Sequence, residues 1–151
     1  MTLPLEPGTE APPIEGIAFA EEPTLLWFYK VTCPVCQMAA PKAQVLAQTY
    51  PVPFHGIGQD PPPKLRAFGR EFGMGAPSVP DLPPYDVSNA YGIRVVPTLF
   101  VVEPGGEISD VVESWDREGY NRVSKDLAAR LGSTYVEISG AGDGLPSFRP
   151  G

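Results

Sequence analysis

The residues best suited to chemistry are the two cysteines, Cys33 and Cys36, which stand in the sequence Cys-Pro-Val-Cys. A thiolate is the nucleophile in disulfide exchange, and a second thiol in the same helical turn can attack a mixed disulfide formed on the first. A disulfide that encloses only two residues restricts the unfolded chain very little, so a purely structural role is a poor explanation. The spacing favours a redox-active pair, with Cys33 as the exposed nucleophile and Cys36 as the buried resolving thiol.

The segments around the pair predict how it is positioned. Residues 24–30 are a continuous apolar and aromatic run, which is typical of a central strand buried on both faces, and we expect Phe28 and Tyr29 in the core. From Pro34 to about residue 49 the apolar spacing becomes helical, with a bend expected at Pro41. Cys33 would therefore lie at a helix N-terminus, where free amides and the helix dipole lower the pKa of a thiol.

Different roles for the cysteines make different demands on the sequence. A zinc site needs two further ligands, and the chain offers one histidine, His55, and no third cysteine, so no metal or other cofactor is expected. His55 is expected to be structural or exposed. A thiol-dependent peroxidase remains an alternative, although the Thr or Ser and the Pro of the peroxiredoxin motif are replaced by Lys30 and Leu26. Two inert thiols, or a binding module without enzymatic activity, would also be compatible with the sequence.

The remaining elements follow from apolar periodicity and from turn residues. Residues 1–16 are expected to form an extended arm, residues 17–19 a short edge strand, and residues 73–84 a loop rich in Gly and Pro. Further expected elements are a strand at 54–58, helices at 63–72 and 86–91, an antiparallel hairpin of strands at 98–102 and 108–112, and a last helix that is capped by Asp116 and stops at Gly132. Residues 133–151 show no clear period and are interpreted as an appended tail. The order predicts a mixed sheet flanked by helices in one domain, residues 17–132.

Composition excludes several classes of partner. Eighteen acidic residues against eleven basic residues give a net charge of −7, which opposes binding to nucleic acid or to an anionic membrane surface. The longest unbroken apolar run, residues 25–29, is far too short to span a bilayer. No basic region followed by an apolar stretch marks a signal peptide, so we expect a cytoplasmic monomer unless a leader has been removed.

Three blocks of sequence together resemble the thioredoxin superfamily, and more closely its TlpA-like, redoxin branch. They are residues 27–41 (WFYKVTCPVCQMAAP), 90–100 (AYGIRVVPTLF) and 103–108 (EPGGEI), and the resemblance spans about residues 11–131. It implies an α/β thioredoxin fold, with a central mixed sheet flanked by helices and with an extra helix and strand inserted at residues 58–84, between the second βα units.

The resemblance also implies an activity, namely thiol–disulfide exchange without any cofactor besides the Cys33–Cys36 disulfide. It implies a cis peptide bond between Val96 and Pro97 beside the cysteines, which would free the carbonyl and amide of Val96 to pair with an extended substrate strand. Val96 and Pro97, together with Thr32 and Pro34 around the first cysteine, are the implied substrate-binding residues. The implied partners are disulfide-containing proteins or small thiols, with an unidentified electron donor.

Three positions depart from the family pattern. Trp27 stands where thioredoxin has a buried Asp, and Ala39 where some TlpA-like proteins have a Glu, so the proton acceptor for Cys36 is unassigned. Water or an inward-turned Lys30 remain open as acceptors, and we expect Cys36 to lose its proton slowly at neutral pH. Thr32 replaces a tryptophan, which makes the predicted partner surface less aromatic.

Overall fold

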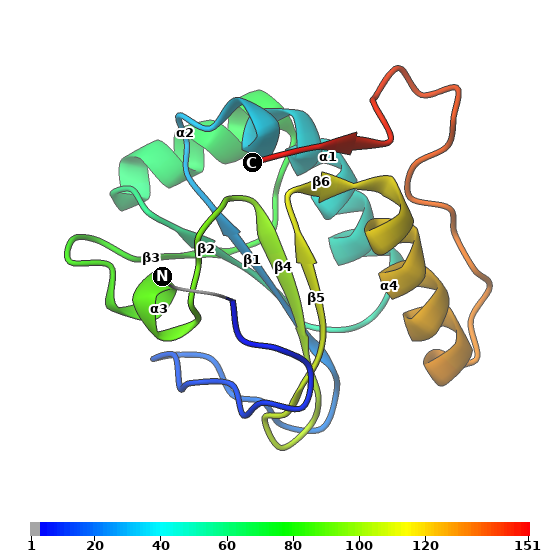
Figure 1. Ribbon diagram of the computed structural model, residues 1–151, viewed down its shortest axis with the longest axis horizontal. Coiled ribbons are helices and arrows are strands. Elements are labelled where there is room, and N and C mark those ends of the chain that lie inside the picture. The colour runs from blue at the N-terminus through cyan, green and yellow to red at the C-terminus, as the bar shows by residue number, and fades with distance from the viewer. Residues whose placement is uncertain (1–3) are drawn as a thin grey trace.

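A mixed five-stranded sheet forms the centre of the molecule (Figure 1). The structure is a computed structural model and describes residues 4–151. The strands are β1 (Thr24–Tyr29), β2 (Phe54–Gly58), β3 (Ser78–Pro80), β4 (Thr98–Val102) and β5 (Ile108–Glu113), in the spatial order β3-β2-β1-β4-β5. The first three strands run parallel, whereas β4 is antiparallel to both β1 and β5. The predicted mixed sheet flanked by helices is therefore confirmed.

Helices connect and cover these strands. They are α1 (Pro34–Thr49), α2 (Pro62–Phe72), α3 (Asp86–Ala90) and α4 (Arg117–Leu131). The parallel pairs need crossover connections, and α1 and α2 supply them, between β1 and β2 and between β2 and β3. Pro41 lies inside α1, as predicted, because the helical pattern resumes after it. None of the helices in the described part of the chain is long and apolar enough to cross a membrane.

The alternation of side chains along β1 divides the core into two layers. Leu25, Trp27 and Tyr29 point into the larger layer, which the apolar faces of α1, α2 and α4 complete. Leu26 and Phe28 point into a smaller layer on the opposite face. Both Phe28 and Tyr29 are fully buried, which confirms the prediction that they belong to the core. In Figure 1 the dark blue N-terminal segment lies along the sheet on the side away from α1 and α4.

The N-terminal segment packs against the smaller core layer. Ala11 and Ile14 are buried there, and Glu10 forms an isolated bridge with Glu107. The first three residues of the arm predicted at 1–16 lie outside the described residues. The strand predicted at 17–19 is wrong: Ile17 only closes a turn, its amide donating to the carbonyl of Ile14. The backbone at the start of β5 pairs instead with residues 8–11, through hydrogen bonds to Gly106 and Ile108.

The region between β2 and β4 holds the helix and strand that the family resemblance implied. The predicted loop at residues 73–84 is wrong in one part, because residues 78–80 form the edge strand β3 and pair with β2. Three residues that end in a proline carry too little alternation to be recognised as a strand.

The C-terminal quarter departs most from expectation. Asp116 precedes α4 as predicted, but its side chain makes no capping hydrogen bond. Asp116 is the N-cap residue of α4 and also belongs to a two-residue strand, β6 (Trp115–Asp116), which pairs with β7 (Phe148–Arg149) from the segment interpreted as a tail. Ile138 and Ser139 of the same segment are buried against the domain. The segment is thus packed back on the molecule along α4 (Figure 1).

Candidate active site

The end of β1 and the start of α1 bring Cys33 to a helix N-terminus. Cys33 is the N-cap residue of α1, with extended backbone angles, and its sulfur accepts a hydrogen bond from the amide of Cys36 at 3.1 Å. Pro34 occupies the first helical position, where its missing amide costs nothing. The arrangement places a sulfur where the unpaired amides of a helix point, which favours a negative charge on it.

Two polar side chains hold the loop between β1 and Cys33. Asp60, which is buried just beyond the C-terminal end of β2, accepts from the amide of Val31 at 2.9 Å. Gln37, one turn into α1, donates to the carbonyl of Val31 at 2.9 Å. Sequence reasoning missed both residues. The position of Asp60 gave a usable signal, because the carboxyl ends of neighbouring parallel strands meet at one edge of a sheet.

The surroundings of Cys33 lower its pKa to about 6. The largest cause is a hydrogen bond from the Cys36 thiol, opposed by partial burial and supported by the backbone amides of Cys36 and Val35. The positive charge of Arg149, on β7, lowers the pKa of Cys33 further. At neutral pH the exposed sulfur of the pair is therefore mainly a thiolate, the nucleophilic form.

Cys36 has the opposite environment. It is fully buried and belongs to the larger core layer, whereas Cys33 is partly exposed, as the sequence predicted. Burial raises the pKa of the Cys36 thiol, and its hydrogen bond to Cys33 raises it further. The two sulfurs are not joined by a disulfide. One sulfur is thus ionised and accessible, while the other is kept protonated beneath it.

The position expected to hold a proton acceptor in the family is occupied by an apolar cluster. Trp27 is fully buried, and its Nε1 donates to the hydroxyl of Tyr120, on α4, at 2.9 Å. Lys30 is exposed, so it does not turn inward. Within residues 4–151 no acidic side chain is hydrogen-bonded to the Cys36 thiol.

A turn before β4 forms the other wall of the site. The peptide bond between Val96 and Pro97 is cis, as the family resemblance implied. The Cys33 sulfur lies 3.4 Å from the carbonyl oxygen of Val96, to which it donates a hydrogen bond only while the thiol is protonated, so this backbone lies directly beside the reactive sulfur. The turn is fixed by Thr98, whose hydroxyl donates to the carbonyl of Val95 at 2.8 Å, and by the amide of Ser114, which donates to the carbonyl of Pro97 at 2.8 Å.

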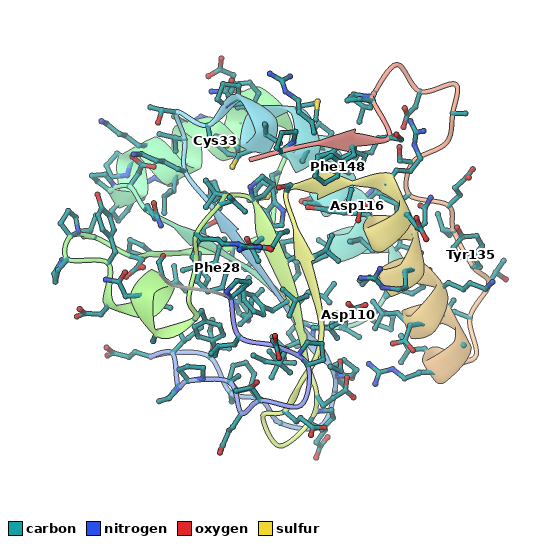
Figure 2. All side chains as sticks on the ribbon, viewed as in Figure 1. Phe28, Cys33, Asp110, Asp116, Tyr135 and Phe148 are labelled. Carbon is teal, nitrogen blue, oxygen red and sulfur yellow. The ribbon has the colours of Figure 1, made fainter. Side chains whose placement is uncertain are left out.

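The other residues predicted for the site are distributed as follows. Thr32 and Pro34 are exposed on either side of Cys33, while Val96 is half-buried and Pro97 is buried. Figure 2 shows Cys33 near the end of the C-terminal strand. His55 lies on β2 opposite Leu26, where partial burial lowers the pKa of its ring. No cluster of three metal-ligating side chains occurs in the part of the chain that is described.

The sequence of the chain, compared with models of protein families, matches the AhpC/TSA family over residues 7–111, well over half of its length. The chain belongs to the AhpC/TSA family. A search of the curated proteins found none that matches the sequence of this chain. The match agrees with the resemblance to the redoxin branch of the thioredoxin superfamily.

Solved structures show that this AhpC/TSA member has a thioredoxin fold. It is similar to Mycobacterium tuberculosis DsbF, in mixed oxidised and reduced forms, at 26% identity and a TM-score of 0.63, over 74% of this chain and 82% of that one. It is also similar to the thioredoxin domain of a thiol-disulfide oxidoreductase from Bacteroides vulgatus (23% identity, TM-score 0.67, 82% and 99% covered). A third structure, a thiol:disulfide interchange protein of Chlorobium tepidum, gives 21% identity and a TM-score of 0.62, over 82% and 97% of the chains.

Proposed function

We propose that the protein is a thiol–disulfide oxidoreductase in which Cys33 attacks a disulfide and Cys36 resolves the intermediate. The observation that carries the proposal is the contrast between the two thiols, since the pKa of Cys33 is lowered to about 6 while burial raises that of Cys36. Membership of the AhpC/TSA family and the likeness to M. tuberculosis DsbF support it.

The reaction conserves atoms and electrons in two displacements. The Cys33 thiolate attacks one sulfur of a disulfide RSSR, so a Cys33–SR bond forms and one thiolate RS⁻ leaves. Cys36, after losing its proton to water, attacks the Cys33 sulfur and expels the second RS⁻. The protein's dithiol is oxidised, one disulfide is reduced to two thiols, and the direction reverses with an oxidised protein and a dithiol partner.

The substrate-binding residues are part of the same proposal. Val96 and Pro97 form the wall that a bound disulfide would contact beside Cys33, and Thr32 and Pro34 form the exposed rim on its other side. The active pair needs no cofactor besides its own disulfide. Resolution is the slow step at neutral pH, because the Cys36 thiol is buried and no acidic side chain in residues 4–151 accepts its proton.

The direct test is the reaction of the reduced protein with a small, neutral disulfide, bis(2-hydroxyethyl) disulfide. The wild type should become oxidised with a Cys33–Cys36 bond, visible as a loss of two mass units. Cys33→Ser should not react, and Cys36→Ser should stop at a stable adduct of one hydroxyethylthio group. An unreactive wild type would reject the proposal and favour a binding module without activity.

The peroxidase alternative is tested with the same reduced protein. Membership of the AhpC/TSA family favours it, whereas Lys30 and Leu26 occupy the places of the peroxiredoxin motif. We expect hydrogen peroxide to oxidise Cys33 no faster than it oxidises another thiol of equal pKa. Peroxide consumption far above that rate would replace disulfide exchange with peroxide reduction as the function.

A further inference from the structure

The C-terminal strap, defined here as residues 148–151, lies across the site that the proposed function assigns to the substrate. It comprises β7 and the two residues after it. In Figures 1 and 2 this red segment runs over the N-terminal end of α1 toward Cys33, with Phe148 at its outer end. The positive charge of Arg149, on β7, also contributes to lowering the pKa of Cys33.

The inner end of the strap rests on the backbone of Val96. A Cβ added to Gly151 would overlap the carbonyl oxygen of Val96, and it would lie 2.9 Å from the carbonyl carbon and 3.3 Å from the amide nitrogen of the same residue. Only a residue without a side chain can approach a backbone this closely. Gly151 therefore covers the same main-chain groups that lie beside Cys33.

Strand pairing and a hydrogen bond to a side chain hold the strap in place. β7 pairs with β6, with Arg149 opposite Trp115 and Phe148 opposite Asp116. The amide of Gly151 donates to the Ser114 hydroxyl at 3.0 Å, and the amide of Ser114 donates to the carbonyl of Pro97 at 2.8 Å. Ser114 thus ties the strap to the same turn that carries Val96.

The chain just before the strap is anchored independently. The buried indole of Trp115 donates to the carbonyl of Pro146 at 2.7 Å. The amide of Arg117 donates to the carbonyl of Ser147 at 2.9 Å. These bonds fix the direction in which the strap leaves the domain, so removal of residues 148–151 alone leaves them intact.

This arrangement separates two kinds of substrate. An extended protein chain that brings a disulfide to Cys33 would use the main-chain edge at Val96, because that edge is adjacent to the sulfur and β4 begins two residues later. The strap already occupies that edge. A low-molecular-weight disulfide needs only the partly exposed Cys33 sulfur, which the strap leaves accessible.

We propose that the C-terminal strap determines substrate specificity: it excludes extended protein disulfides from Val96 and leaves the site to low-molecular-weight disulfides. The proposal rests on the proposed function of Cys33 and Cys36. A protein substrate must first displace the strap, and its apparent affinity falls by the fraction of molecules in which the strap is open.

The experiment compares two substrates on the reduced protein, insulin as the protein disulfide and bis(2-hydroxyethyl) disulfide as the small one. The measured quantity is the ratio of the two rate constants for oxidation of the Cys33–Cys36 pair, obtained by alkylation and mass spectrometry. Removal of residues 148–151 should raise the ratio of the insulin rate constant to the small-disulfide rate constant about tenfold. In the wild type insulin must first break one or two hydrogen bonds of the strap, and in the deletion that cost is absent.

A point variant guards against loss of folding in the deletion. Gly151→Val should also raise the ratio, because its side chain overlaps the backbone of Val96 and the end of the strap must move away. Gly142→Val is the matched control, since a Cβ there meets no atom within 4 Å, and its ratio should equal that of the wild type.

The outcomes separate the two proposals. If the ratio stays at the wild-type value in both the deletion and Gly151→Val, the strap does not determine substrate specificity. Reaction with the small disulfide would still support the proposed function. A wild type and variants that all fail to react with the small disulfide refute the proposed function and the strap's role with it.

Discussion

The acidity of Cys33 gives a prediction whose size can be worked out. Against an ordinary value of 9.0, the pKa of this thiol is lowered to about 6. At pH 5 the thiolate fraction is then on the order of 900 times that of an ordinary thiol, but a less basic thiolate is about 20-fold less nucleophilic, given a Brønsted slope of about 0.45. The net acceleration is about 40-fold at pH 5 and only about fourfold at pH 7.

The perturbation that tests this is Cys36→Ala, which removes the largest cause of the shift, the hydrogen bond from the Cys36 thiol. The amides of Cys36 and Val35 belong to the backbone and remain. In Cys36→Ala the pKa of Cys33 should therefore rise above that of the wild type and stay below the ordinary value.

The assay is the rate of alkylation by iodoacetamide from pH 4 to pH 10, with the site of labelling identified by mass spectrometry. The reduced wild type should take up one label, on Cys33, with a midpoint near pH 6, because Cys36 is buried and protonated. A wild-type midpoint near 9, an unchanged midpoint in Cys36→Ala, or equal labelling of both cysteines at pH 7 would refute this reasoning.

Two further predictions concern the surroundings of the pair. Arg149→Gln should raise the pH midpoint for alkylation of Cys33, because a positive charge that favours the thiolate is lost. This upward shift should shrink in high salt. The control Lys125→Gln, which makes the same charge change on α4, should leave the midpoint in place. Trp27→Phe should lower the free energy of unfolding in urea by about 1–3 kcal/mol, because it leaves the buried Tyr120 hydroxyl without its donor; an unchanged value would show that this bond contributes nothing.

The sequence was sufficient for the elements that carry strong local patterns. The apolar run that becomes β1 and the periodicity after Pro34 predicted the strand and helix on either side of Cys33, with β1 ending within one residue of its predicted limit. Burial on both faces leaves a strand no polar positions, so a central strand is easily recognised. The exposed and buried positions of the two thiols followed from that placement.

The edges and the supports of the site could not be predicted in the same way. β3 and β7 have three and two residues, and each depends on a partner strand that is distant in sequence. A pairing of that length leaves no periodicity, and the prolines on both sides of β7 indicate loop rather than strand. Asp60 and Gln37 act through single hydrogen bonds to one loop residue, Val31, which no local pattern encodes.

Reactivity and access at Cys33 depend on different elements, and this distinguishes the two strap variants. The amides that stabilise the thiolate belong to α1, whereas Gly151, which covers Val96, belongs to the C-terminal strap. Arg149 is the exception, because it lies on the strap and also lowers the pKa of Cys33. Deletion of residues 148–151 should therefore open Val96 and raise that pKa together, whereas Gly151→Val keeps Arg149 in the chain. Below pH 6 the deletion should react more slowly with a small disulfide than Gly151→Val does, and equal rates would mean that access and charge are not separable in this site.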